Sequence, residues 1–237
     1  MWNTMEYEKL VAPTIMELFE SRIQASILSG DLREGEKLPS EREMAEKMGI
    51  SKSAVHLGLK NLERSGFIRI EPRKGIYVEN WAEKGGLETL AALLKSNVLK
   101  LEKKNIKSLI QMREAIEGDA MSILGNNHSE ENIQKLLSIA AEIRKGKQVY
   151  SADELAELAF RFAHYICFSA GNTFSSLMLN SFKKFALALW REWIEQVGPE
   201  SAAAYLTEIA HAIESGNGQR AADIEHAYHL DFLDTLK

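Results

Sequence analysis

The sequence contains a single cysteine and has no apolar run long enough to form a membrane-spanning helix. The lone Cys167 excludes an internal disulfide and fits a reducing cytoplasm. Its apolar neighbours, in YICFSA, indicate a buried structural thiol rather than a nucleophile. The amino-terminal stretch MWNTMEYEKL lacks the positive region and apolar core of a secretory signal. We therefore expect a cytoplasmic protein that does not associate with a membrane.

The short motifs of common catalytic sites are also missing. We find no HExxH metal motif, no GxSxG nucleophile elbow and no glycine-rich phosphate loop. The single buried cysteine offers no activated thiol. These absences predict that the protein is not an enzyme.

Positive charge is scarce overall but concentrated in one segment. The formal net charge of -5 argues against a protein that coats nucleic acid without specificity. Basic residues nevertheless outnumber acidic ones between Arg42 and Gly75. This asymmetry is typical of a DNA-binding module joined to a different kind of domain, although a solvated charged face would give the same count. The basic residues are Arg42, Lys47, Lys52, Lys60, Arg64, Arg69, Arg73 and Lys74; the acidic ones are Glu43, Glu46, Glu63 and Glu71.

The first 80 residues show a change from helical to extended periodicity. Ser40 and Glu43 form a capping box that starts a second helix, and Ser51 caps a third helix that Gly66 ends. The alternation in FIRIEP and IYVEN, separated by RKG, then predicts a β-hairpin. Three helices followed by a hairpin is the order of a winged helix-turn-helix. The expected elements are helices at about 13–30, 40–48 and 51–66 and a hairpin at 67–80.

One residue inside the third helix points to tight packing. A glycine in a helix interior costs about 1 kcal/mol relative to alanine. Gly58 occupies such a position. We therefore predict that another helix packs closely against it.

The remainder of the chain shows only helical signals, interrupted by Gly, Asn and Pro clusters. We expect a mainly α protein, in which a winged helix-turn-helix domain at 1–80 and a linker at 81–86 precede an all-helical bundle at 87–237. The bundle would serve effector binding and dimerisation. Its predicted helices are at about 87–101, 106–124, 130–144, 152–169, 174–197, 202–215 and 219–236.

Two long stretches, GEKLPSEREMAEKMGISKSAV and LERSGFIRIEPRKGIYV, resemble the DNA-binding domain of the GntR family of bacterial transcription regulators. The resemblance covers about residues 15–78. The helical remainder is similar to the sensor domain of the FadR subgroup of that family, mainly in YVENWAEKGGLETLAALL and LAFRFAHYICFSAGNTFSSLMLNSFK. This resemblance implies a homodimer that binds double-stranded operator DNA and responds to a small-molecule effector. A winged helix that binds another protein instead of DNA is the alternative.

In that fold, the first turn of the third helix enters the major groove. Lys52 can donate to guanine, Ser53 can bond to a base or phosphate, and the methyl group of Ala54 can contact thymine. His56 can donate one proton when neutral and two when charged, or can simply face solvent. The family usually has arginine at positions 52 and 56, so we expect a weaker or altered operator preference. The predicted DNA-binding residues are Arg42, Ser51, Lys52, Ser53, Ala54, His56, Arg73, Lys74 and Gly75.

The resemblance also implies an effector site in the helical domain. FadR-subgroup proteins often have an arginine at the position of Arg113, where it lines the pocket and helps to hold an acyl-CoA. A salt bridge with Glu117, one helical turn away, is the alternative role for this guanidinium. Aromatic residues such as Trp190 would line the pocket or simply belong to the core. The predicted ligand-binding residues are Arg113, Tyr165, Asn180 and Trp190.

Many members of the subgroup instead hold a metal through one Asp and three His, and the metal holds a small carboxylate effector. Here the first two ligand positions fall on Ala159 and Ala163, the third falls near Leu206, and the last falls near Tyr228 or His229. The standard metal site is therefore not expected. We expect no cofactor other than an acyl-CoA effector. A shifted metal site is the alternative, formed by His164, His211, His226 and His229.

Overall fold

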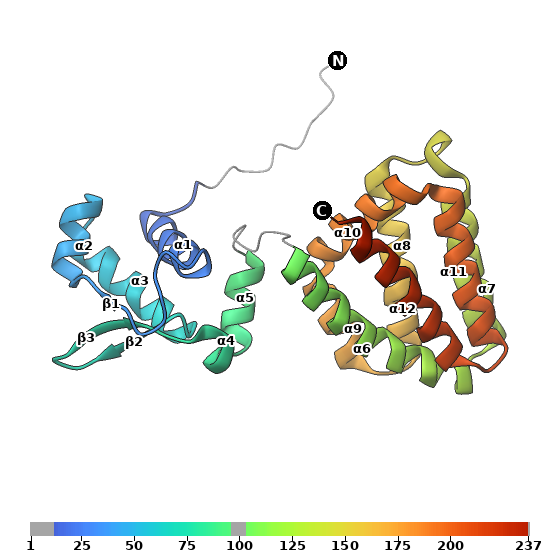
Figure 1. Ribbon diagram of the computed structural model, residues 1–237, viewed down its shortest axis with the longest axis horizontal. Coiled ribbons are helices and arrows are strands. Elements are labelled where there is room, and N and C mark those ends of the chain that lie inside the picture. Colours follow the sequence, from blue (N-terminus) through green and yellow to red (C-terminus); the bar gives the residue numbers. More distant parts are fainter. Residues whose placement is uncertain (1–11, 96–102, 237) are drawn as a thin grey trace, which may run out of the picture. The chain divides into compact units, whose positions relative to one another are not determined.

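A computed structural model describes residues 12–95 and 103–236, which form two compact units, Met1–Lys100 and Leu101–Lys237 (Figure 1). The first unit combines helices with a small sheet, and the second unit is entirely helical within the described residues. The mainly α fold with an amino-terminal winged helix-turn-helix is thus confirmed.

The first unit begins with the winged helix-turn-helix. The sheet is antiparallel, with strand order β1-β3-β2. The hairpin expected from the sequence is present as β2 and β3, and β1 adds a short third strand to its edge. The elements are α1 (Ile15–Leu28), β1 (Lys37–Leu38), α2 (Glu41–Met48), α3 (Lys52–Arg64), β2 (Ile68–Glu71) and β3 (Gly75–Val78).

Side-chain caps fix where α2 and α3 begin. The Ser40 hydroxyl accepts a hydrogen bond from the Glu43 amide, and the Glu43 carboxylate accepts one from the Ser40 amide at 2.8 Å. The Ser51 hydroxyl accepts from the Ala54 amide at 3.2 Å. Between the two helices, Gly49 adopts a left-handed conformation with φ 65°, which glycine reaches without steric cost. The turn between the helices is therefore set by local sequence.

The core of the first unit lies where α1 and the sheet cover α3. Val55, Leu59 and Leu62 of α3 are fully buried. A Cβ atom on Gly58 would lie 2.5 Å from Cδ1 of Phe19 in α1, which is far inside van der Waals contact. The predicted close packing of a helix against Gly58 is confirmed.

The segment expected to be a linker contains a short helix, α4 (Trp81–Lys84), capped by the Asn80 side chain. It is followed by α5 (Leu87–Lys95). The buried Thr89 hydroxyl of α5 donates to the Ser65 carbonyl at 2.7 Å. Because Leu93 also joins the core of the first unit, α5 packs with this unit, whereas the sequence analysis assigned it to the second domain.

The second unit is a helical bundle with α8 in contact with α6, α7, α9 and α10 (Figure 1). The most extensive packing in this unit is that of α11 against α7 and of α12 against α6. The elements are α6 (Lys103–Asn127), α7 (Glu130–Arg144), a 3-10 turn η1 (Gly146–Gln148), α8 (Ala152–Ser169), α9 (Thr173–Ser181), α10 (Lys183–Val197), α11 (Pro199–Glu214) and α12 (Gly218–Thr235).

The single helix predicted for residues 174–197 is wrong, because the chain breaks it at Phe182. This residue leaves the helical conformation, with φ -98° and ψ 5°, and ends α9 while it begins α10. The break allows Phe182 to be buried while α10 changes direction along α8. Within the described residues, none of the helices is long and apolar enough to cross a membrane.

Candidate functional site

The first turn of α3 forms an exposed polar surface. Lys52, Ser53 and His56 are exposed, and Ala54 is half-buried. The hydroxyls of Ser51 and Ser53 lie 3.0 Å apart, so Ser51 both caps the helix and contacts its neighbour. Because Lys52 and His56 are exposed, their side chains are accessible to a binding partner.

The turn between β2 and β3 projects a second group of basic residues. The Lys74 amide donates to the Glu71 carbonyl at 3.0 Å, which closes a tight turn with Pro72 and Arg73 at its centre. Arg73 has φ 64°, in the left-handed region that side chains other than glycine rarely adopt. The turn places the Arg73 side chain in solvent at the tip of the hairpin.

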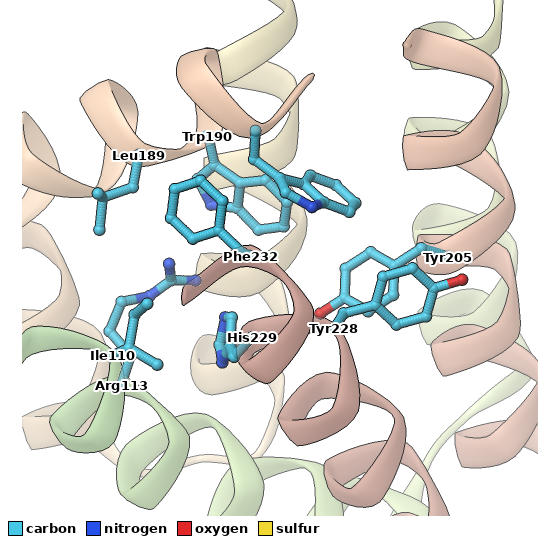
Figure 2. A pocket seen from close by; sticks show the side chains of 9 residues that line it. Ile110, Arg113, Leu189, Trp190, Tyr205, Tyr228, His229 and Phe232 are labelled. Atoms are coloured by element: carbon cyan, nitrogen blue, oxygen red, sulfur yellow. The ribbon is translucent and has the colours of Figure 1, made fainter. Parts of the chain in front are cut away.

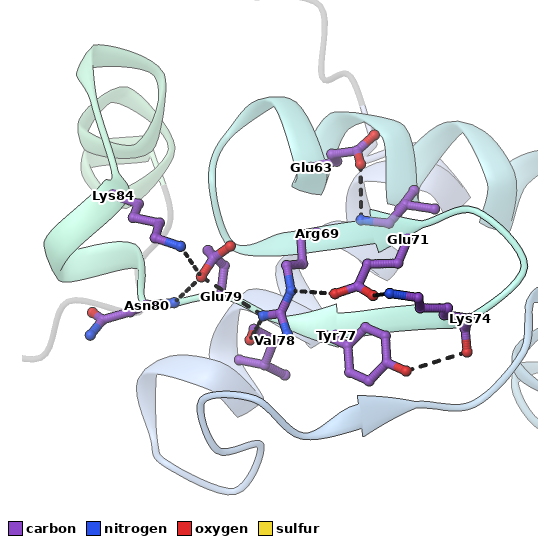
Figure 3. Close-up of polar contacts among 10 residues, drawn as sticks. Glu63, Arg69, Glu71, Lys74, Tyr77, Val78, Glu79, Asn80 and Lys84 are labelled. Atoms are coloured by element: carbon purple, nitrogen blue, oxygen red, sulfur yellow. Dashed lines mark hydrogen bonds and ion pairs between the residues drawn. The ribbon is translucent and has the colours of Figure 1, made fainter.

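Ion pairs organise the rest of this hairpin (Figure 3). The Glu71 carboxylate pairs with Arg69 at 3.1 Å and with Lys74 at 3.3 Å. Hydrogen bonds from Arg69 and Lys74 hold the pKa of Glu71 below its usual range. The Arg69 guanidinium also stacks over the Tyr77 ring, 5.0 Å from its centroid. Lys74 is therefore partly neutralised, whereas no ion pair is recorded for Arg73 in the described part of the chain.

The start of α2 and the hairpin tip line one groove of about 740 Å³, which includes Ser40, Glu41, Arg73 and Lys74. Arg42, next along α2, is exposed and pairs with Glu46 at 3.3 Å. The starts of α2 and α3 also touch, through Glu41 and His56. The structure thus brings the predicted DNA-binding residues to the exposed ends of two helices and the hairpin.

The second unit contains a small cavity between α6, α10, α11 and α12 (Figure 2). Its volume is about 30 Å³, enough for about two water molecules. Its walls are apolar and aromatic except for one guanidinium, one imidazole and the phenol groups. The lining residues are Ile110, Arg113, Leu189, Trp190, Trp193, Tyr205, Tyr228, His229 and Phe232.

Arg113 is fully enclosed and already paired. Its Nε and Nη2 atoms donate to the two carboxylate oxygens of Glu117, at 2.7 and 3.2 Å. The guanidinium carbon lies 5.5 Å from the centroid of the Trp190 ring, close enough for a cation–π interaction. Arg113 therefore forms the salt bridge considered from the sequence and also lines the cavity.

A second buried carboxyl completes this cluster. Glu225 of α12 hydrogen-bonds to Glu117. Burial and the Glu117 charge raise the pKa of Glu225 well above its usual value, so this carboxyl carries a proton. Burial alone would raise the pKa of Glu117, but the Arg113 charge and the hydrogen bonds with Glu225 and Arg113 together outweigh this effect and lower it overall. The cluster consequently contains one cation, one anion and one neutral acid, and is electrically neutral.

Histidine side chains flank the same cluster. The Glu114 carboxylate lies 2.9 Å from Nδ1 of His229 and 3.2 Å from Nδ1 of His226. The hydrogen bond with His229 is the main cause of a lowered pKa for Glu114. Burial lowers the pKa of His229 although the Glu114 contact opposes it. A carboxylate can only accept, so His229 donates from Nδ1 and turns its other ring nitrogen away from Glu114.

Only part of the predicted ligand set lies at this cavity. Arg113 and Trp190 line it, but Tyr165 accepts a hydrogen bond from Asn132 beside a separate surface groove. Asn180 is exposed on α9. The sequence analysis did not select Tyr205, Tyr228, His229 and Phe232 as ligand-binding residues. On α12 these last three have the spacing of one helix face, but this spacing equally fits core packing.

The alternative metal site is not assembled. His164 stacks on Phe160, with ring centroids 5.9 Å apart, and His211 contacts Glu214 at 2.9 Å. Only His226 and His229 meet, at Glu114, because the four histidines lie on three helices with different neighbours. No group of three or more potential metal ligands occurs among the residues that the structure describes.

Comparisons with known families give two adjacent matches. Residues 18–78 match the model of the bacterial regulatory proteins of the gntR family, and residues 108–230 match the model of the FCD domain. The protein belongs to the GntR family of transcription regulators with an FCD domain. The first match covers most of the winged helix-turn-helix, and the second covers the polar cluster and the cavity-lining residues except Phe232.

Curated relatives of this GntR-family regulator carry the name fatty acid metabolism regulator protein. The one from Proteus mirabilis is 26% identical over 210 residues, which span 88% of this chain and 85% of the relative. The one from Shewanella pealeana is 30% identical over 167 residues, or 69% and 66% of the two chains. A solved structure of Lar, described as controlling the Listeria monocytogenes agr system, shares the fold with a TM-score of 0.57, 13% identity and coverage of 95% and 97%. The family is one of transcription regulators and not of enzymes.

Proposed function

We propose that this regulator is a homodimer that binds operator DNA through α3 and the hairpin tip, and that an acyl-CoA entering the aromatic cavity changes its DNA affinity. We also propose that it acts in the cytoplasm, where its DNA target lies. The observation that carries the effector part is the apolar cavity lined by Arg113, whose charge is neutralised by the Arg113–Glu117–Glu225 cluster. The exposed first turn of α3 carries the DNA part.

Residues with different roles support the DNA contact. Lys52 and Ser53 begin α3, where a recognition helix meets base edges. Arg73 has no recorded ion pair in the described residues and projects from the hairpin, as a phosphate or minor-groove contact requires. Arg42 is exposed near the start of α2, and its neighbours Glu41 and Glu43 line the groove. Pseudo-palindromic operators and homodimeric regulators match each other through two-fold symmetry.

Charge in the cavity favours an acyl thioester over a free carboxylate. Glu117 already neutralises Arg113, so a second anion would enter a buried site with no positive charge to spare. The acyl chain and thioester of an acyl-CoA are uncharged, and its phosphates would remain in solvent. The apolar walls formed by Trp190, Trp193 and Phe232 suit an acyl chain.

The cavity must open before such a ligand can enter. Small-molecule sites usually measure about 300–1,000 Å³, roughly ten to thirty times the cavity of about 30 Å³ described here. The two helices that supply most of the aromatic lining have different main neighbours, since α10 packs on α8 and α12 packs on α6 and α11. Separation of α10 from α12 would enlarge the cavity without breaking the main contacts of either helix.

Selection of operators from random DNA, followed by a salt titration, tests the DNA part. We expect log affinity to fall steeply with log salt, and Arg73→Ala, which removes the proposed phosphate contact, to reduce the slope by about one. Lys135→Ala, an exposed lysine of the second unit, is the matched control and should leave the slope unchanged. Failure to recover any bound sequence would refute this part.

Thermal denaturation with added ligands tests the effector part. Acyl-CoAs should raise the melting temperature, whereas CoA alone and free fatty acids should have little effect. Tyr228→Ala should weaken this shift, and Tyr165→Ala, which alters a tyrosine away from the cavity, should not. Stabilisation by a divalent metal with a small carboxylate, and not by acyl-CoA, would refute the acyl proposal in favour of the metal-dependent alternative.

A further inference from the structure

The imidazole of His56 on α3 is held by a residue of the neighbouring helix. Its Nδ1 atom lies 2.8 Å from Oε1 of Glu41, at the start of α2. The His56 side chain is 57% exposed, whereas the Glu41 side chain is 27% exposed. Glu41 therefore supports the ring from the protein side and leaves its outer edge open to solvent.

This contact decides which ring nitrogen is free. An ionised carboxylate has no proton to donate, so Nδ1 of His56 must carry the hydrogen of this bond. In a neutral imidazole, Nε2 then has a lone pair and no hydrogen. Among the described residues, no partner of Nε2 is recorded. The exposed atom of His56 is consequently a hydrogen-bond acceptor.

We infer that His56 is a specificity-determining residue that accepts a hydrogen bond from the amino group of an adenine or a cytosine in the major groove. Adenine N6 and cytosine N4 are the donors that base edges present there, whereas guanine presents only the acceptors O6 and N7. Glu41 acts as a positioning residue, because it fixes the tautomer. This inference rests on the proposed insertion of α3 into the major groove.

The charged groups around His56 lie on its own helix and on α2. On α3 itself, Lys52 lies one turn before His56 and Lys60 lies one turn after it, and Lys60 pairs with Glu63 at 2.9 Å. On α2, Glu41 is the charged group in contact with the ring, since the neighbouring Arg42 pairs with Glu46. The hydrogen on Nδ1 is therefore fixed by Glu41 rather than by either lysine.

Operator selection at neutral pH with wild type and His56→Arg tests the inference. Arginine donates two hydrogen bonds to guanine, so the operator position whose preference differs between the two proteins is the position contacted by residue 56. At that position we expect adenine or cytosine for the wild type and guanine, on the same strand, for His56→Arg. A guanine preference of the wild type would overturn the inference, because it requires a doubly protonated donor.

A base analogue without the amino group tests the hydrogen bond from the base to Nε2 of His56 directly. The selected base is replaced by purine or 2-pyrimidinone, which lack the amino group of adenine or cytosine. Loss of one hydrogen bond predicts roughly three- to tenfold weaker binding of the wild type. Equal binding of the analogue would overturn the inference.

Glu41→Ala tests the positioning role, with Glu46→Ala as the control of equal charge on the same helix. Both substitutions remove a negative charge near DNA and raise the overall affinity by similar factors. Only Glu41→Ala removes the carboxylate that holds the hydrogen on Nδ1 of His56, so that either ring nitrogen can carry it. The preference for adenine or cytosine over guanine should then fall roughly three- to tenfold. An unchanged preference would refute the role of Glu41. Absence of any selected operator would instead refute the proposed DNA binding, which separates the two failures.

Discussion

Glu225→Gln should change how the stability of the second unit depends on pH. Glu225 is buried, and burial together with the nearby Glu117 charge raises its pKa well above the ordinary value. In the unfolded chain a glutamate loses its proton at an ordinary pKa of about 4.3. Above that pH the folded chain retains a proton that the unfolded chain has released. Stability contributed by Glu225 is therefore present at low pH and is lost as the pH rises toward its folded-state pKa.

Glutamine has nearly the same shape as protonated glutamate and can donate to Glu117, but it does not titrate. One retained proton changes the free energy of unfolding by about 1.4 kcal/mol per pH unit. For each pH unit between the unfolded-state and folded-state pKa values, Glu225→Gln should gain about 1.4 kcal/mol on the wild type, or about 3–6 °C in melting temperature for a domain of this size. Circular dichroism melts between about pH 5 and pH 8 measure this difference.

The double variant Glu117→Gln, Glu225→Gln is the control for the charge assignment. It leaves Arg113 buried without an anion, which costs about 3–5 kcal/mol. In Glu117→Gln alone, Glu225 can ionise beside Arg113, so the loss should be smaller. Parallel stability curves of the wild type and Glu225→Gln across this pH range would refute the assignment of the proton to Glu225.

The first unit supplies three further predictions. Gly58→Ala should destabilise it by about 1–3 kcal/mol, because the added methyl meets the Phe19 ring; faster hydrogen exchange in α1 and α3 would report this loss, and a stabilised variant would exclude it. Arg73→Gly should raise the melting temperature slightly, by removing about 1 kcal/mol of left-handed strain, while it weakens binding in an operator titration. Equal affinity would exclude a DNA contact at the hairpin tip. Ser40→Ala should cost about 1 kcal/mol in a denaturant titration through loss of the Glu43 capping box, whereas no change would show that solvent replaces the cap.

Local signals in the sequence predicted most helix boundaries. The helices α7 and α8 begin and end where the sequence analysis expected, because Ser129 and Ser151 cap them through their own side chains. The break at Phe182 has no such signal, since no glycine or proline marks it. The strand β1 is two residues long and exists only through its pairing with β3, a contact between distant parts of the sequence.

The candidate sites were predictable to different degrees. Residues at the start of α3 are contiguous in sequence, so the family resemblance could select them together. The cavity joins four helices, and an aromatic residue on α11 or α12 has the same periodicity whether it lines a cavity or fills the core. Likewise, the contact of Glu41 with His56 depends on the angle between two helices, which local sequence patterns do not specify.

The hydrogen bond of Thr89 has a consequence for how two ligands influence each other. The buried hydroxyl ties α5 to the carbonyl of Ser65 at the end of α3, and the chain continues from α5 into the second unit. Operator and effector must change each other's affinity by the same factor, whatever the route between them. Replacement of Thr89 by valine keeps the shape and removes the tie. The dissociation constants for operator alone and for effector alone should stay close to their wild-type values. The factor by which the effector changes operator affinity should move closer to one.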